Sequence, residues 1–250
     1  MLTPKRHALI IELIKQKQLV TIQELVELTN VSESTIRRDL SELETKQKLA
    51  RVHGGATAIQ SARQELSYRE KTDKYVEEKK QIAQLAAALI RPHDCIYLDA
   101  GTTTYEIIPH LETLNVTVVT NGLTHLELLN QYQIKSFLLG GLIKHTTRAI
   151  IGSQALHNLK LYHFDKVFIG TNAIDPSFGY STPDPEEASV KSAAITQGSQ
   201  SFIVADHSKL NQRSFAKIAE LAQATLIIDS IPADLENKLR EQTDIKVVTA

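Results

Sequence analysis

Residues 31–46 contain side chains of the types that contact nucleic acid. At helical spacing, one face of this stretch presents Ser34, Thr35, Arg37 and Arg38. Arginine can donate two hydrogen bonds to a guanine, hydroxyl groups can bond to either kind of base, and both groups can bind phosphate. The pattern predicts an element that lies in a DNA groove. An amphipathic surface helix with two solvated arginines has the same pattern and stays open as the alternative.

The opposite face of this stretch is apolar and predicts attachment to a small core. Ile36, Leu40 and Leu43 recur at helical spacing, and Ser32 can accept a backbone N–H at the helix start. We assign Asp39 to structure, where its carboxylate holds a neighbouring cation.

The chain before this stretch supplies the elements that position it. Residues 4–17 have a helical period, residues 18–20 form a short connection, and Thr21 with Glu24 forms a capping box at the start of a second helix. A tight turn at Asn30 then leads into the next helix. Two short helices joined by about 3–4 residues form a helix-turn-helix, whose second helix enters the major groove.

A short alternating run follows and predicts a hairpin or wing. Residues 49–56 end in the pair Gly54 and Gly55, which is typical of a tight turn. Arg51 and His53 fall where a wing meets the DNA backbone. A turn histidine that makes no DNA contact is the alternative for His53.

This N-terminal part resembles the DeoR-type bacterial repressors. The residues that carry the resemblance are Arg6, Ile10, Ile14, Ser32, Thr35, Ile36, Arg37, Arg38, Asp39 and Leu40, followed by Arg51, Val52, His53, Gly54, Gly55 and Ala56. The resemblance implies a mostly α-helical, winged helix-turn-helix domain, followed by a sugar-phosphate sensor.

Composition limits the class of protein. The chain has 250 residues, 42% of them hydrophobic and 23% charged, which leaves room for one large domain and one small one. No stretch approaches the roughly 18 unbroken apolar residues that a membrane span needs, so we expect no contact with a membrane. The single cysteine, Cys95, cannot form an internal disulfide, and this favours the reducing cytoplasm. We expect Cys95 to be a buried packing residue.

The distribution of charge predicts an oligomer. The whole chain has a net charge of −1, while residues 1–57 have nine Lys and Arg against seven Asp and Glu, a net charge of +2. One copy with this charge makes few phosphate contacts, so we expect at least a dimer on DNA.

The chain divides into three parts by composition. Residues 1–57 form the winged domain, and residues 58–75 are polar and predict a linker with solvated charges. Residues 76–250 alternate short apolar strands with helices, which predicts an α/β domain with a mainly parallel sheet. The expected strands lie at residues 95–98, 116–120, 136–139, 166–169, 202–205, 226–228 and 246–248.

Polar residues follow these strands, at the sheet edge where such domains bind ligands. Gly101, Thr102, Thr103 and Thr104 combine a glycine, three hydroxyls and a helix start, which favours a phosphate, although a capped turn has the same residues. The expected partners for the rest of a phosphorylated sugar are Asn121, Asp175 and Glu187 for hydroxyl groups, and Lys209 with Arg148 for the negative charge.

The family resemblance also covers this second part. Its motifs match Asp99, Gly101, Thr102, Thr103, Thr104, Asn121, Gly140, Gly141, Gly170, Glu187, Lys191, Asp206 and Lys209. The resemblance implies that Asp99 and Lys191 also belong to the effector site. The sensor domains of this family are similar to the ribose-5-phosphate isomerase and CoA-transferase fold.

An active sugar-phosphate isomerase is the main alternative. Such enzymes need a carboxylate base, and the related isomerases have Asp-Gly-Ala-Asp-Glu where residues 169–173 here read Ile-Gly-Thr-Asn-Ala. Asn172 cannot act as a base, so we expect no catalysis and no cofactor. An architectural DNA-binding protein with an inert second domain is a third possibility. The nine histidines show no spacing that predicts a metal site.

We interpret the chain as a repressor of a sugar-utilisation operon, which leaves operator DNA when a phosphorylated sugar binds. Residues 170–175, 182–184 and 186–187 resemble those of fructose operon repressors most closely, which implies fructose 1-phosphate as the effector. Tagatose 6-phosphate, through the lactose-type relatives, is the second choice.

Overall fold

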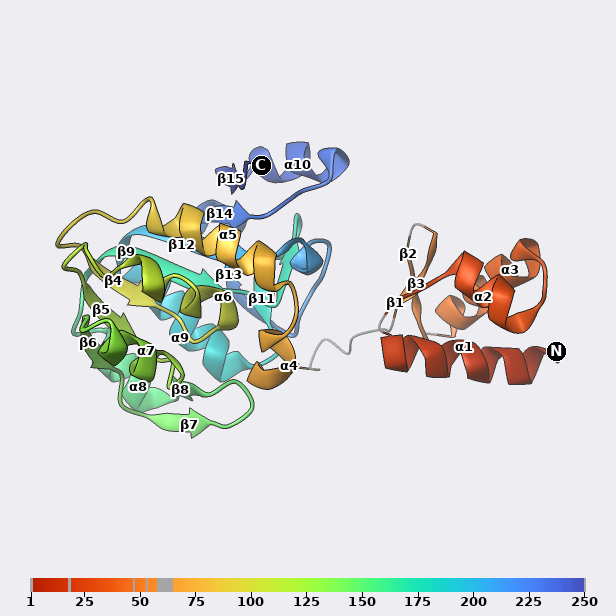
Figure 1. Cartoon of the computed structure of the whole chain (residues 1–250), viewed down its shortest axis with the longest axis horizontal. Coiled ribbons are helices and arrows are strands. Elements are labelled where there is room, and N and C mark those ends of the chain that lie inside the picture. The colour runs from red at the N-terminus through yellow and green to blue at the C-terminus, as the bar shows by residue number, and fades with distance from the viewer. Residues whose placement is uncertain (1, 18, 47, 53, 58–64, 250) are drawn as a thin grey trace. The chain divides into compact units, whose positions relative to one another are not determined.

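The structure, a computed structural model, describes residues 2–17, 19–46, 48–52, 54–57 and 65–249. The chain divides into two compact units, Met1–Ser61 and Ala62–Ala250 (Figure 1). The prediction for His53 falls outside the described residues.

The N-terminal unit combines helices with a three-stranded antiparallel sheet in the order β1-β3-β2. The helices are α1 (Thr3–Lys17), α2 (Ile22–Thr29) and α3 (Glu33–Thr45), and the strands are β1 (Leu19–Thr21), β2 (Ala50–Val52) and β3 (Gly55–Thr57). The predicted helix-turn-helix and wing are both present.

One detail of the predicted wing was wrong. Residues 18–20 were expected to form a plain connection, but Leu19–Thr21 pairs with β3 as a third strand, with Val20 opposite Ala56. The partner lies far along the chain, and three residues are too few for an alternating pattern to reveal a strand.

Polar caps define the start of α2 and the turn between α2 and α3. Thr21 Oγ1 accepts the N–H of Glu24 at 3.2 Å, and the Glu24 carboxylate accepts the N–H of Thr21 at 3.1 Å, which completes the predicted capping box. Asn30 ends α2 in the left-handed region at φ 52°. Ser32 Oγ then accepts the N–H of Thr35 at 3.4 Å and starts α3.

Asp39 holds the first helix against the third, as predicted. Its carboxylate is 3% exposed and accepts hydrogen bonds from Arg6 Nε at 2.5 Å and Arg6 Nη2 at 3.0 Å, with His7 Nε2 at 3.1 Å. Burial acts to raise the pKa of Asp39, but the bonds from Arg6 and His7 outweigh it and lower the pKa. The buried side chains of Ile36 and Leu40 complete this core.

The C-terminal unit is built on a seven-stranded sheet in the order β15-β14-β12-β9-β4-β5-β6, with every neighbouring pair parallel (Figure 1). The strands are β4 (Cys95–Leu98), β5 (Thr117–Thr120), β6 (Lys135–Leu138), β9 (Phe164–Gly170), β12 (Gly198–Ala205), β14 (Thr225–Ile228) and β15 (Ile245–Val247). Each of the strands expected from the sequence is present in this sheet.

Helices cover both faces of the sheet and create two apolar cores. Along β4, Tyr97 faces one core, whereas Ile96 and Leu98 face the other. This alternation explains why the central strands are apolar throughout. The helices are α5 (Val76–Ala87), α6 (Thr102–Tyr105), α7 (His125–Gln131), α8 (Ser153–Leu159), α9 (Pro185–Thr196) and α10 (Ala233–Arg240), with 3-10 turns η1 (Ile108–His110), η2 (His207–Lys209) and η3 (Leu221–Gln223). No helix of the described residues is long and apolar enough to cross a membrane.

Small antiparallel additions and one exposed residue differ from the sequence-based expectation. The additions are the pair β7 (Leu142–Lys144) with β8 (Ala149–Ile151), and the sheet of β10 (Ala173–Asp175), β11 (Gly179–Thr182) and β13 (Ala216–Ala219). Cys95 was expected to be buried, but it is exposed, because it is the first residue of β4 and lies at the rim of the sheet.

Candidate functional site

The outer face of α3 presents the polar side chains expected to contact DNA. Ser34, Arg37 and Arg38 are exposed and Thr35 is half-buried. The hydroxyl of Ser32 lies 3.0 Å from that of Ser34 and 2.9 Å from that of Thr35, so these side chains are organised around the helix start.

The wing attaches to this face through Arg51. Arg51 Nη1 donates to Ser41 Oγ at 2.7 Å, and Ser41 Oγ donates to the carbonyl of Arg37 at 3.0 Å. Arg37 in turn donates from Nε to Glu33 Oε1 at 2.9 Å. The structure therefore brings Arg37 and Arg51 to one surface of α3.

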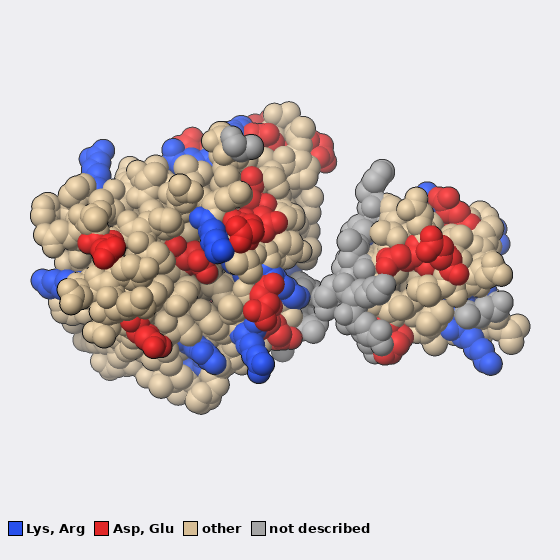
Figure 2. All heavy atoms as spheres, viewed as in Figure 1, with Lys and Arg blue, Asp and Glu red and all other residues tan. Residues whose placement is uncertain are grey.

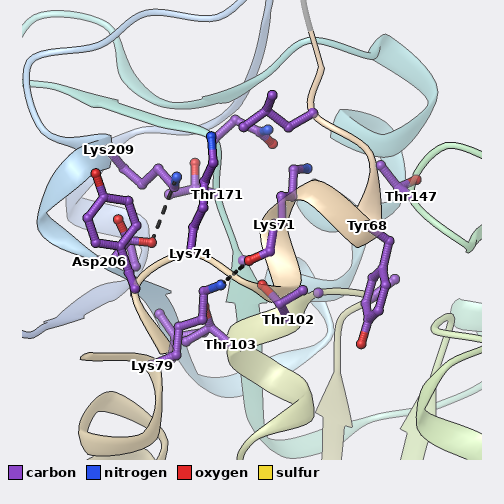
Figure 3. Close-up of a pocket in the computed structure, with 18 of the residues that line it drawn as sticks. Tyr68, Lys71, Lys74, Lys79, Thr102, Thr103, Thr147, Thr171, Asp206 and Lys209 are labelled. Carbon is purple, nitrogen blue, oxygen red and sulfur yellow. Dashed lines mark hydrogen bonds and ion pairs between the residues drawn. The ribbon is translucent and has the colours of Figure 1, made fainter. Parts of the chain in front are cut away.

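A pocket lies at the carboxyl ends of β4, β9 and β12, which are neighbours in the sheet. The predicted residues that line it are Gly101, Thr102, Thr103, Glu187, Lys191 and Lys209. Figure 3 shows Lys71, Lys74, Lys79 and Lys209 arranged around Thr102, Thr103 and Thr171. Hydroxyl and ammonium groups thus dominate this part of the wall.

Hydrogen bonds from buried side chains fix the conformation of the loop after β4. The Thr104 hydroxyl donates to the Asp99 carbonyl at 2.6 Å, so Thr104 stabilises the loop and does not line the pocket. His125 Nε2 lies 3.3 Å from the Gly101 carbonyl and its Nδ1 lies 2.9 Å from the Thr120 hydroxyl. Burial lowers the pKa of His125 to about 4, so its ring is neutral and donates to Gly101.

A buried ion pair forms the floor of the pocket. Lys191 Nζ contacts Asp99 Oδ2 and donates to the Gly170 carbonyl at 3.1 Å, while the N–H of Gly170 donates to the same carboxylate oxygen at 3.1 Å. Burial opposes the charge of Lys191, yet Asp99 and Glu187 raise its pKa above the ordinary value. Lys191 therefore stays charged beneath the pocket, and Asp99 acts through Lys191.

Besides Asp99 and Thr104, three predicted effector residues are absent from the pocket lining. Asn121 is 2% exposed, accepts the N–H of Ala100 at 2.8 Å and donates to the Ile150 carbonyl at 3.1 Å, so it positions the loop. Arg148 lies over the ring of Tyr68, 5.5 Å from its centroid, and faces an adjacent recess.

Asp175 belongs to a turn. It pairs with Arg213 at 2.8 Å and accepts the N–H of Ser177 at 2.8 Å, and these contacts lower its pKa to about 2 despite partial burial. Asp175 is paired with Gly179 in the β10–β11 hairpin, and it is not among the residues that line the pocket. We therefore remove Asp175 from the set of effector-binding residues.

The segment before α5 contributes pocket residues that the sequence did not reveal. The short helix α4 (Tyr68–Thr72) and the residues around it supply Tyr68, Lys71 and Lys74 to the wall. The expected solvated linker was wrong for Glu65 and Lys71, whose side chains are only 8% and 25% exposed. Ser67 and Glu70 form a capping box at the start of α4, and this pattern was the available signal.

Two of the pocket lysines have no carboxylate within ion-pair distance among the described residues. These are Lys74 and Lys79, whereas Lys71 lies 3.5 Å from Glu65 and Lys209 lies 3.7 Å from Asp206. Burial lowers the pKa of Lys79 to about 8, and its Nζ donates to the Lys71 carbonyl. The pocket therefore has positive charge available for an anionic ligand.

Comparison with known proteins agrees with these two units. A winged helix-turn-helix followed by an α/β unit with a cationic pocket is an architecture typical of DNA-binding transcriptional regulators. The model of the DeoR-like helix-turn-helix domain matches residues 6–62, and that of the DeoR C-terminal sensor domain matches residues 74–230. The chain belongs to the DeoR family of DNA-binding transcriptional repressors, which confirms the resemblance found in the sequence.

The similar relatives include named regulators of bacteria. The chain is 46% identical over 249 residues to the uncharacterised HTH-type transcriptional regulator FruR of Bacillus subtilis, covering 99% of each chain. It is 31% identical to the lactose phosphotransferase system repressor of Staphylococcus epidermidis, covering 96% of each. A solved ribose-5-phosphate isomerase of Methanocaldococcus jannaschii is 18% identical, with a TM-score of 0.40 over 53% of each chain, which is a weak similarity.

Proposed function

We propose that this protein represses a sugar-utilisation operon, most closely one for fructose, and leaves its operator when a phosphorylated sugar fills the pocket. The observation that carries the proposal is Lys79, which is buried beside Thr102 and Thr103 without a carboxylate partner among the described residues. The names of the relatives support the sugar class, since FruR is more similar than the lactose-type repressor.

The proposed phosphate subsite lies between the loop after β4 and the lysines of the opposite wall. The backbone N–H groups of Thr102 and Thr103 open α6 and have no backbone acceptor among the described residues. A phosphate dianion matches the two ammonium groups of Lys74 and Lys79 in charge, and accepts charge-assisted hydrogen bonds from them. Lys209 lines the same wall and stays in the set that neutralises the phosphate, whereas Arg148 leaves it.

The sugar hydroxyls are expected to meet the carboxylate of Glu187 and the residues near it. Glu187 lines the pocket, is 5% exposed and accepts a hydrogen bond from the Thr147 hydroxyl at 2.5 Å. Lys191 and Lys144 keep its pKa below the ordinary value although burial acts to raise it. A charged carboxylate of this kind can accept bonds from two sugar hydroxyls.

We also propose that the protein does not catalyse the isomerisation of sugar phosphates. Asn172 occupies the loop where the related isomerases have a carboxylate, and it accepts a hydrogen bond from the Thr182 hydroxyl at 2.9 Å. An amide cannot take the proton that isomerisation moves between carbons. Measurable ketose–aldose interconversion by the pure protein would contradict this part.

The proposed operator contacts come from α3 and the wing. Ser34, Thr35, Arg37 and Arg38 meet the bases and phosphates of the major groove, and Arg51 meets the adjacent backbone. We expect at least a dimer, because one unit with a net charge of +2 makes few phosphate contacts. Sedimentation of a monomer both in free solution and on the operator would contradict the dimer.

The test is operator binding by the wild-type protein and by Gly101→Asp, titrated with fructose, fructose 1-phosphate and tagatose 6-phosphate. A Cβ at Gly101 lies 3.1 Å from Thr104 Oγ1, and the added carboxylate repels a phosphate. Gly101→Ala is the control, because it adds the Cβ without the charge. We expect fructose 1-phosphate to release the wild-type protein from the operator. The Gly101→Asp variant should bind the operator and stay bound when fructose 1-phosphate is added.

Each other outcome changes a stated part of the proposal. Release by unphosphorylated fructose would refute the need for phosphate, and normal release of Gly101→Asp would refute the site. Release by tagatose 6-phosphate alone would replace the sugar and keep the mechanism.

A further inference from the structure

The residues at the start of the C-terminal unit form one wall of its pocket. Residues 65–75, which we call the strap, include α4 and supply Leu66, Tyr68, Lys71 and Lys74 to the lining. The backbone that comes from the N-terminal unit enters the described part of the C-terminal unit at the beginning of the strap. The strap therefore lines the pocket and also lies on the stretch of chain that leads to the DNA-binding unit.

The strap is attached mainly through polar contacts. Helix α4 has no buried residue. The Tyr68 N–H donates to the Thr146 carbonyl at 2.8 Å, Arg148 lies over the Tyr68 ring, and Lys79 Nζ donates to the Lys71 carbonyl. Contacts of this kind can exchange for others at low cost, whereas an apolar core would hold the segment in one place.

Glu65 makes the central contact of the strap. Its side chain is 8% exposed, contacts Lys144 Nζ and lies 3.5 Å from Lys71 Nζ. Lys144 also lies 2.8 Å from Asp184 Oδ2 and 3.1 Å from Glu187 Oε1. An ionic network therefore runs from the strap to the Glu187 carboxylate in the wall of the pocket.

Two contacts made by strap residues involve groups that an anion would attract. Lys71 pairs with Glu65, and Lys79 donates to the Lys71 carbonyl, yet both ammonium groups line the pocket. Burial lowers the pKa of Lys71 as well as that of Lys79, so the charge of each ammonium group is not fully compensated by its neighbours. A phosphate dianion offers both of them a stronger acceptor than a carbonyl or a longer ion pair.

We propose that the strap switches its anchor when the effector binds, and that this exchange transmits occupancy of the pocket to the DNA-binding unit. In the structure Glu65 anchors the strap to the rest of the C-terminal unit through Lys144, and it pairs with Lys71 within the strap. With an anion bound, Lys71 and Lys79 turn to the anion, and the strap follows them. The inference rests on the proposed function, because it requires a phosphorylated ligand in this pocket.

The main test is the full-length variant Glu65→Gln, which removes the anchoring charge and keeps the shape of the side chain. Its control is Asp73→Asn, which makes the same chemical change at an exposed residue of the strap. Operator affinity is measured with and without saturating fructose 1-phosphate, and binding of the sugar phosphate is measured separately by calorimetry. An allosteric effector typically changes the affinity of a protein for its other ligand, here the operator, by about 5–150-fold.

We expect the effector to reduce operator affinity in the wild type and in Asp73→Asn by a factor in that range. In Glu65→Gln the reduction falls by about tenfold, or disappears, while the calorimetric affinity for fructose 1-phosphate stays within about threefold of wild type. If the effector reduced the operator affinity of Glu65→Gln as much as that of the wild type, the switch would be overturned and the proposed function would stand.

Hydrogen exchange provides a readout that does not depend on DNA. In the wild-type protein, saturation with fructose 1-phosphate is expected to change the exchange rates of the amides of residues 65–75 more than those of α10. Binding without any change in the strap amides would overturn the inference. Failure of fructose 1-phosphate, tagatose 6-phosphate and inorganic phosphate to bind at all would overturn the proposed function, and the inference with it.

Discussion

The candidate sites of the two units place their charged pairs differently. In the N-terminal unit the ion pair of Arg37 with Glu33 lies on the outer face of α3, with side chains 54% and 58% exposed. In the C-terminal unit the pair of Lys191 with Asp99 is 5% and 1% exposed. The first pair can open at little cost and free its arginine for a large partner, whereas the second can only support a ligand that enters its pocket.

The distribution of charged side chains over the surface differs between the units in the same way. The outward arginines of α3 suit a polyanion that is larger than the unit itself. The inward lysines of the pocket leave the outer surface mixed, and Figure 2 shows acidic and basic side chains interspersed over the visible face of the C-terminal unit. The visible face is not uniformly basic, as a surface suited to nucleic acid would be, whereas the outer face of α3 carries exposed arginines.

The largest expected effect breaks the buried pair of the N-terminal unit. Asp39→Ala removes the carboxylate that faces the buried Arg6 guanidinium, and should destabilise this unit by about 3–5 kcal/mol. Hydrogen exchange of α3 in increasing urea measures the loss, with α9 of the other unit as an internal reference. Arg38→Ala is the control, and the free energy of unfolding of its N-terminal unit should stay within about 0.5 kcal/mol of the wild-type value. Equal protection of α3 in Asp39→Ala and wild type would contradict the structural role of the pair.

Acid should loosen the C-terminal unit before the N-terminal unit. The pKa of His125 falls from 6.5 to about 4 on burial, so the unfolded chain takes up a proton first and stability falls as the pH drops through this interval. The expected loss is about 3 kcal/mol at the lower end. Asp39, whose folded pKa lies below 3.8, loses its contribution only at lower pH.

The measurement is the urea midpoint of each unit between pH 7 and pH 4, followed by exchange of segments from each. His125→Gln should remove most of the pH dependence of the C-terminal unit over this range. An unchanged slope in this variant would show that other groups cause it.

The operator contacts should depend more on Arg38 than on Arg37. Arg38→Ala is expected to cost about 1–3 kcal/mol of operator binding. Arg37→Ala should cost less, because wild-type Arg37 must leave Glu33 before it reaches DNA. Affinity measured over a range of salt concentrations separates base contacts from phosphate contacts. Lys238→Ala, which removes one exposed charge from α10, is the control, and an equal loss in that variant would refute a specific role of α3.

The smallest expected effect concerns the charge of Lys79. Its pKa of about 8 means that the empty pocket loses a positive charge in alkaline solution, so effector binding should weaken by about tenfold per pH unit above this value. Lys79→Gln should bind more weakly at neutral pH and lack this dependence. Calorimetry with fructose 1-phosphate at pH 7, 8 and 9 tests it, and an equal dependence in both proteins would exclude Lys79 as its origin.

The sequence alone determined the features that depend on neighbouring residues. The period of Ile36, Leu40 and Leu43 predicted which face of α3 is buried and therefore which face carries Arg37 and Arg38. Short apolar runs predicted the strands of the large sheet. The loop at Gly101 was then the candidate for a ligand site, because parallel sheets bind ligands at the carboxyl ends of their strands. In each case the physical cause acts within a few residues of the pattern.

Only the tertiary structure decided which polar side chains face the pocket. Lys71 lies in a polar segment that is indistinguishable from a solvated linker, and Lys79 lies on the first turns of α5, until both pack against strand ends. Asn121 and Asp175 follow or border strands as ligand-binding residues do, yet Asn121 is occupied by Ala100 and Ile150, and Asp175 by Arg213. A polar side chain takes its role from the partners that folding brings to it, and those partners lie up to tens of residues away along the chain.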